Sequence, residues 1–265
     1  MSISLYGEHN MSDTPPDTTN AFNSAADWRV RMSLGTTANY LYKAQSAPGV
    51  LLPLKATDGV VFPYTPTINV SYTAAYDSLA PTHSNFKLHH YQSSAVDNFT
   101  ITCEFTAQDT FEANYVLACI HFFKSLTKMF YGQDQDPKIG TPPPLVFIYG
   151  LGAFQFNKHP LLVTNFAYAL PKDVDYIRAT NNEEASGGAG VQLIGGQLEP
   201  GGVRPVATFT DTNDQAITFV PTKLTMTITC LPVVSRNDIS NSFSLKDYAT
   251  GKLLRGSQRT GGGIW

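Results

Sequence analysis

The fold class is decided by Phe99-Thr100-Ile101-Thr102-Cys103-Glu104-Phe105 and by residues 109–129, which follow as DTFEANYVLACIHFFKSLTKM. In the first segment, apolar and polar side chains alternate, which predicts a β-strand with one buried face. In the second, Asp109 and Glu112 fit a helix capping box, and apolar residues recur every three or four positions. The spacing predicts one helix over residues 110–130. Since the two one-sided elements are a short turn apart, their apolar faces should pack against each other.

The rest of the chain is dominated by strand-like segments. Five further strands are expected, at residues 28–34, 68–74, 145–149, 161–170 and 222–231. The last of them carries Thr225, Thr227 and Thr229 on one face and apolar side chains on the other. The sequence therefore predicts a mainly β protein with a single flanking helix.

The two ends and one internal segment lack any such pattern. Residues 1–26 are rich in Ser, Thr, Asn and Asp and predict a flexible N-terminal arm. Residues 27–250 are predicted to form the β domain, which includes a mobile loop at 181–202 that is rich in Asn, Glu and Gly. Residues 251–265 predict a C-terminal arm that ends in an apolar anchor, Ile264-Trp265.

The composition limits the possible functions. Only 15% of the residues are charged, against roughly 25% in typical soluble domains. So low a charge content favours a surface that is buried against partners. The formal net charge is -3, so tight binding to a nucleic-acid backbone is not expected.

The cysteines and the hydropathy pattern give expectations about the environment. Cys103, Cys119 and Cys230 are odd in number and have no CxxC spacing, which indicates reduced thiols in the core. The N-terminal residues show no basic region followed by a long apolar run, so no signal peptide is expected. No apolar stretch approaches the ~20 residues of a membrane helix, so no membrane insertion is expected.

No motif for catalysis or cofactor binding is found. The sequence lacks G-x-S-x-G, a phosphate-binding loop and H-E-x-x-H. The glycine-rich segment 187–190 lacks the Lys-Ser/Thr pair that a phosphate and a metal ion require. His89 and His90 are adjacent, so on a strand they point to opposite faces and cannot chelate one ion together. We expect no catalytic, cofactor-binding or metal-binding residues, and the chain is not expected to be an enzyme.

Two weaker patterns have alternative interpretations. Asp173 and Asp175 could be paired acids for glycoside chemistry, but turn-forming aspartates that pair with lysine are the preferred interpretation. Arg29 and Arg31 lie on one face of the expected strand that begins at Trp28. They could form a nucleic-acid stripe, but pairing with acidic residues of a neighbouring subunit is favoured.

A set of short segments carries a resemblance to a known family. These segments are Asp27-Trp28-Arg29-Val30-Arg31, Phe62-Pro63-Tyr64-Thr65-Pro66, Thr82-His83-Ser84-Asn85, Lys128-Met129-Phe130-Tyr131-Gly132-Gln133, Gly140-Thr141-Pro142-Pro143-Pro144, Phe156-Asn157 and Asp173-Val174-Asp175-Tyr176-Ile177. Together they resemble a baseplate or tail-tube-initiator protein of contractile-tailed phages, particularly those of cyanobacterial and marine myophages. The resemblance covers residues 27–180 and 222–250.

The resemblance implies a fold and a function. The fold would be an antiparallel β-sandwich or half-barrel of tail-tube type, with one helix and extended terminal arms. The function would be structural: a homohexameric ring in the virion, most simply the tail tube initiator that joins the baseplate hub to the tail tube and lines the DNA channel. Assembly would take place in the host cytoplasm. The implied partners are further copies of the chain, tail tube and baseplate hub proteins, wedge or sheath proteins, and phage DNA in transit.

Several alternatives stay open at this point. Within the class, the chain could be the major tail tube protein or the tube terminator. From other classes, it could be a baseplate cell-wall hydrolase or a carbohydrate-binding fibre module. A hydrolase would need a cleft with a carboxylic acid or a metal triad. A fibre module would need exposed aromatic residues on loops.

Overall fold

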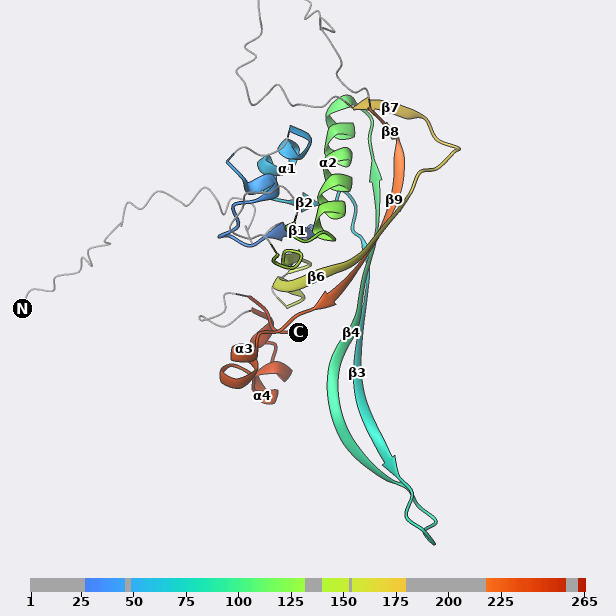
Figure 1. The fold of residues 1–265 in the computed structure, drawn as a ribbon, viewed down its shortest axis with the longest axis vertical. Coiled ribbons are helices and arrows are strands. Elements are labelled where there is room, and N and C mark those ends of the chain that lie inside the picture. The colour runs from blue at the N-terminus through green and yellow to red at the C-terminus, as the bar shows by residue number, and fades with distance from the viewer. Residues whose placement is uncertain (1–26, 46–48, 132–139, 153, 180–217, 256–261) are drawn as a thin grey trace, which may run out of the picture.

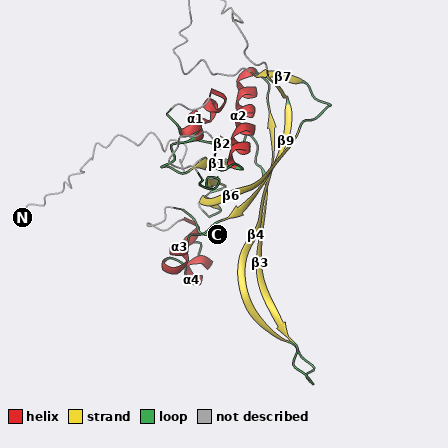
Figure 2. Cartoon of the chain, viewed as in Figure 1, coloured by secondary structure: helices red, strands yellow, loops and turns green. Residues whose placement is uncertain are grey.

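A seven-stranded antiparallel sheet forms the centre of the structure (Figures 1 and 2). The computed structural model describes residues 27–45, 49–131, 140–152, 154–179, 218–255 and 262–265. The predicted arm 1–26 and the predicted loop 181–202 therefore lie outside the described residues. The strand order is β2-β1-β5-β6-β9-β4-β3, and every neighbouring pair is antiparallel.

The elements have the following bounds. The strands of the main sheet are β1 (Arg31–Leu34), β2 (Val60–Val61), β3 (Thr67–Leu79), β4 (Leu88–Thr106), β5 (Val146–Gly150), β6 (Phe156–Ala169) and β9 (Lys223–Pro232). A separate two-stranded ribbon consists of β7 (Tyr176–Ala179) and β8 (Thr218–Pro221). The helices are α1 (Leu52–Ala56), α2 (Thr110–Leu126), α3 (Arg236–Asn241) and α4 (Leu245–Ala249), with 3-10 turns at Leu41–Lys43, Gly49–Leu51 and Leu253–Arg255.

Helix α2 begins as the sequence predicts and ends earlier. The Asp109 side chain accepts a hydrogen bond from the backbone N–H of Glu112 at 2.8 Å, which satisfies an N–H group of the first turn. The helix stops at Leu126 instead of residue 130. At its end, the backbone N–H and the hydroxyl of Thr127 both donate to the carbonyl of Lys124, which tightens and closes the last turn.

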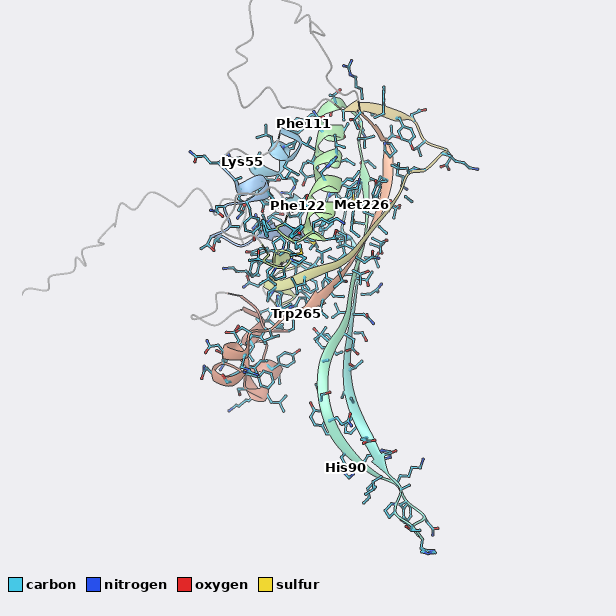
Figure 3. The ribbon with its side chains drawn as sticks, in the orientation of Figure 1. Lys55, His90, Phe111, Phe122, Met226 and Trp265 are labelled. Atoms are coloured by element: carbon cyan, nitrogen blue, oxygen red, sulfur yellow. The ribbon has the colours of Figure 1, made fainter. Side chains whose placement is uncertain are left out.

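The core lies between the sheet and α2, as the sequence predicts. Phe99, Ile101, Cys103 and Phe105 of β4 are buried in one cluster with nine side chains of α2. Figure 3 labels two further members of this cluster, Phe122 of α2 and Met226 of β9. Across this layer the rings of Phe123 and Phe166 stack with their centroids 5.3 Å apart. All three cysteines are buried and free, so their prediction as core thiols is confirmed.

The mainly β, antiparallel prediction is confirmed, but the predicted number of helices is wrong. The layer that faces the sheet is α2, and the second sheet among the described residues has two strands, so the sandwich or half-barrel of tail-tube type stays a prediction. The single predicted helix is joined by α1, α3 and α4, each of five or six residues. Helices this short lack the two turns of apolar periodicity by which a sequence reveals them.

The strand predicted at 28–34 is shorter in the structure, and Trp28 is exposed instead of buried. Val30, Met32 and Leu34 are buried as expected, but Trp28 is 59% exposed. It lies before β1, which begins only at Arg31, so the alternation does not extend back to it.

Strands β3 and β4 continue far beyond their predicted ends and form an arm that projects from the body (Figure 1). Strand β9 accompanies β4 only between Phe99 and Thr106. Residues 88–98 of β4 therefore pair with β3 alone. The sequence of residues 88–95 lacks alternation because both faces of this part of β4 are exposed.

The C-terminal residues belong to the core, which corrects the predicted tether for residues 262–265. Trp265 is 8% exposed and packs against Phe99 at a centroid distance of 5.0 Å. Its indole N–H donates to the carbonyl of Pro160 at 2.7 Å. The backbone N–H of Gly263 donates to Asn157 at 2.7 Å, so the chain end is held along β6. The apolar side chain of Trp265 is therefore buried by residues of its own chain, and its burial does not require a partner.

Candidate assembly surfaces

One face of the central strands β6, β9, β4 and β3 is polar and uncovered. Facing residues in neighbouring antiparallel strands lie on the same side of the sheet. One such row consists of Ala167, Thr227, Thr102 and Thr67. The next row consists of Asn165, Thr229, Thr100 and Asn69. The opposite face of these strands carries the buried core residues.

This polar face is close to neutral. Within residues 67–70, 99–106, 162–169 and 223–231, the only charged side chains are Glu104 and Lys223. They form an ion pair with a distance of 3.2 Å between Nζ and Oε2. Hydroxyl and amide groups thus dominate the face, and its two charges cancel.

The four strands have an open edge on each side. Strand β5 pairs with β6 only from Phe156 to Leu161, so residues 162–169 of β6 have no described strand on that side. At the other end of the sheet, β3 is the edge strand. Successive antiparallel pairing makes β6 and β3 run in opposite directions. Open edges of this length readily pair with another chain.

The arm carries large apolar side chains in solvent. Tyr76 and Tyr91 lie edge to face across it, with ring centroids 5.8 Å apart. Towards its tip, Leu79, Phe86 and Leu88 are all more than half exposed. The arm also places His89 and His90 in adjacent, exposed positions of β4.

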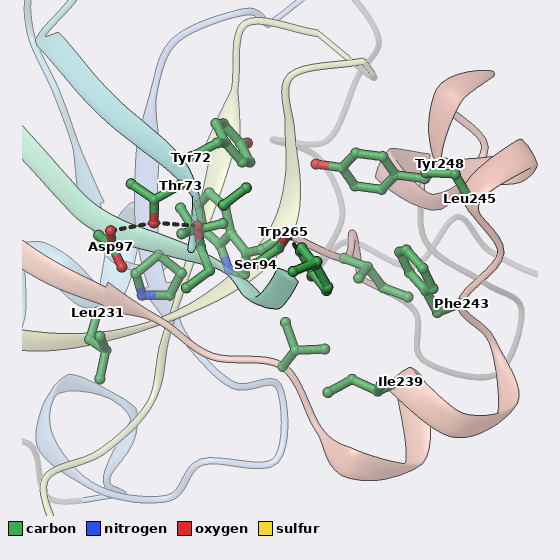
Figure 4. A pocket seen from close by; sticks show the side chains of 17 residues that line it. Tyr72, Thr73, Ser94, Asp97, Leu231, Ile239, Phe243, Leu245, Tyr248 and Trp265 are labelled. Carbon is green, nitrogen blue, oxygen red and sulfur yellow. Dashed lines mark hydrogen bonds between the residues drawn. The ribbon is translucent and has the colours of Figure 1, made fainter. Parts of the chain in front are cut away.

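A groove lies between the root of the arm and the C-terminal helices (Figure 4). Its volume is about 860 Å³. One wall is the root of the arm, where the Thr73 hydroxyl donates to the carboxylate of Asp97. The other wall is formed by Ile239, Phe243 and Leu245, which are themselves largely exposed. The lining is mainly apolar.

The residues considered for catalysis or cofactor binding in the sequence do not form a site among the described residues. Asp173 and Asp175 are exposed and lie in the bend before β7 instead of in a cleft. The glycine-rich segment 187–190 lies outside the described residues. Within the described part of the chain, no three His, Cys, Asp or Glu residues are grouped so as to hold a metal ion.

The basic residues near Trp28 have partners in their own chain. Arg29 forms an ion pair of 2.9 Å with Asp27, and its hydrogen bond lowers the pKa of the Asp27 carboxyl. The guanidinium of Arg31 lies over the ring of Tyr149, 4.9 Å from its centroid. Arg29 thus has an acidic partner in its own chain, and its predicted pairing across a subunit interface stays a prediction.

No helix among the described residues has both the length and the apolar character needed to cross a membrane. No protein-family model matches the chain, and neither does any curated protein sequence.

Sequence reasoning identified part of these surfaces. The alternation in β9 predicts its threonine face. The open edge of β6, however, depends on where its pairing with β5 ends, and no local sequence pattern predicts that position. The groove combines β3, β4, β9, α3, α4 and the chain end, so it becomes apparent only in the folded chain.

Proposed function

We propose that this chain is a structural subunit of a homohexameric ring in a contractile phage tail, most simply the tail tube initiator. The observation that carries the proposal is the four-stranded segment β6-β9-β4-β3, which has an open edge on each side. Because these two edges run in opposite directions, β3 of one copy can pair antiparallel with β6 of the next. A head-to-tail contact of this kind forms a ring when its rotation closes.

The polar face fits the inside of such a ring. The face opposite it is covered by α2, so only the polar face is available to line a channel. DNA binds proteins mainly through lysine and arginine contacts to its phosphates. A lining of threonine and asparagine, with one cancelling ion pair, provides almost no such contacts. It would let DNA slide through without holding it.

The other assignments have less support in the structure. The tail tube and tube terminator remain open, because the edges and the polar face would serve any ring of the tail. A hydrolase needs a cleft with converging acids, whereas Asp173 and Asp175 lie exposed on a bend. A sugar-binding module would need exposed aromatic residues on loops, and Trp28, Tyr64 and Phe86 are such residues, but the open sheet edges and the neutral polar face would play no part in that function.

Cysteine cross-linking across the two edges tests the proposal. Single cysteines at Thr67, Asn69 or Ser71 of β3 are combined in one chain with single cysteines at Asn165, Ala167 or Ala169 of β6. Paired strands bring opposite Cα atoms to about 4.5–5.5 Å, which is within disulfide range. The three native thiols are buried and do not interfere.

The expected product is a covalent ladder that ends at six subunits. Each single-cysteine chain should remain uncross-linked beyond a dimer. If all nine combinations fail to give products beyond those of the single-cysteine controls, the two edges do not meet and the proposed ring is wrong.

A further inference from the structure

The groove at the arm root is an apolar surface on the side of β4 that faces β9. It is lined by the end of β9 through Leu231 and Pro232, and by the exposed residues Ile239, Phe243 and Leu245. Grouped apolar side chains of this kind mark interaction sites. The floor also contains residues 94–97 of β4. This part of β4 does not pair with β9, so its backbone edge on that side is open. An extended segment placed there could add backbone hydrogen bonds to the edge.

The tip of the arm has the complementary property. Phe86 is 80% exposed, and Leu79 and Leu88 beside it are both 53% exposed. The arm consists of two strands only, and an isolated two-stranded hairpin is at best marginally stable in water. The tip therefore gains both burial and order if another surface covers it.

The tip cannot reach the groove of its own chain. The arm root forms one wall of that groove, and Leu88 lies three residues nearer the tip than Tyr91, the groove residue of β4 closest to the tip. At about 3.4 Å per residue, this separation is roughly 10 Å along the strand. Since β3 and β4 stay paired as far as Leu79 and Leu88, the hairpin does not fold back onto its own root. An arm tip that binds the groove would therefore belong to a different molecule.

We propose that the groove binds the arm of a second copy of this chain, with Leu79, Phe86 and Leu88 against Phe243 and Leu245. The inference rests on the proposed ring, in which β3 of one copy meets β6 of the next. The arm continues β3 beyond the body, and the groove lies on the β9 and β6 side of β4. The neighbour that brings its β3 edge to β6 thus brings its arm to the same side as the groove.

The test uses two variants with opposite defects. The groove variant carries Phe243→Glu and Leu245→Glu, and the arm variant carries Phe86→Glu and Leu88→Glu. All four positions are exposed in the subunit, so both variants should fold, which thermal melting verifies. Phe111→Glu is the matched control, because Phe111 is 76% exposed and lies outside both surfaces. Assembly is measured by sedimentation velocity over a range of concentrations.

Each double variant should need at least about a tenfold higher concentration to assemble, as expected when central apolar contacts are lost. The Phe111→Glu control should assemble like the unaltered chain. Mixing the two variants should give a 1:1 dimer, because one intact arm and one intact groove remain. If both variants assemble normally, or if the mixture stays monomeric, the arm does not bind the groove.

The outcomes separate this inference from the proposed ring. Six-membered rings that survive both double substitutions would leave the ring proposal intact and overturn the inference. Open, groove-dependent chains of variable length would support the inference and overturn the ring. A chain that stays monomeric at every concentration would overturn both.

Discussion

The indole of Trp265 lies against the imidazole of His159, with the ring centroids 4.8 Å apart. Both side chains are buried, at 8% and 1% exposure. The Nδ1 atom of His159 accepts a hydrogen bond from the backbone N–H of Asn157 at 3.0 Å. A Cβ on Gly263 would lie 2.2 Å from the His159 ring, so only glycine lets the chain end approach this closely. These contacts hold residues 263–265 against β6.

Replacing Trp265 by alanine should destabilise the fold strongly. The substitution leaves a cavity beside Phe99 and Phe156 and should cost about 3–5 kcal/mol of the free energy of unfolding. Chemical denaturation of the purified chain measures this. The control is Trp28→Ala, which removes a largely exposed side chain and should change stability by less than about 0.5 kcal/mol. Equal stability of the two variants would show that the chain end is a loose arm after all.

His159 should make the protein sensitive to mild acid. Burial lowers the pKa of this imidazole from 6.5 to about 4 in the folded state. Between these two values the unfolded chain binds the extra proton and the folded chain does not, so stability falls as the pH decreases. The loss should begin near pH 6.5, level off near pH 4 and total about 3 kcal/mol.

The measurement compares urea denaturation between pH 7 and pH 4 for the unaltered chain and for His159→Asn. The asparagine carbonyl can replace Nδ1 as acceptor but cannot titrate, so the variant should lack this part of the pH dependence. His89→Asn, at an exposed position of β4, should keep it in full. Parallel curves for the unaltered chain and His159→Asn would refute the assignment.

Ile120→Ala should destabilise the packing of α2. Ile120 is 6% exposed and belongs to the core cluster, so the loss should be about 2–5 kcal/mol. Phe111→Ala, at an exposed position of the same helix, should change stability by less than about 0.5 kcal/mol. Guanidinium denaturation of both variants measures these changes in the free energy of unfolding. A loss below that limit for Ile120→Ala would mean that α2 does not cover the sheet.

The native cysteines should react slowly with thiol reagents. Burial raises the pKa of Cys103 and Cys230 to about 12. It also raises the pKa of Cys119, a buried residue of α2. Only the thiolate is reactive. Labelling should become complete only in denaturant, whereas an added cysteine at the exposed position Ser78 should react at once. Rapid reaction of the unaltered chain would contradict the described core.

The sequence predicted those parts of the fold in which one face is buried over several residues. Strands β4 and β9 and helix α2 were found because their apolar residues repeat with a fixed period. The arm was missed because both faces of residues 88–95 are exposed, and exposed strands carry no alternation. Helices α3 and α4 bury no residue and leave no periodic trace.

The role of Trp265 was predicted wrongly for a related reason. An apolar pair after a glycine-rich stretch looks the same in sequence whether it docks on its own chain or on another. The difference lies in the site it meets, which combines Phe99, Phe156 and His159 from separate strands. Likewise, the open edges of β6 and β3 follow from the strand order and not from their residues.

The most direct test of the account is the mass of the assembled protein, measured by native mass spectrometry together with negative-stain images. The chain should form a closed particle of six times the subunit mass of 28.9 kDa, which appears as a six-fold ring with a central channel. A particle of one subunit mass at all concentrations, or a closed particle without a channel, would contradict it.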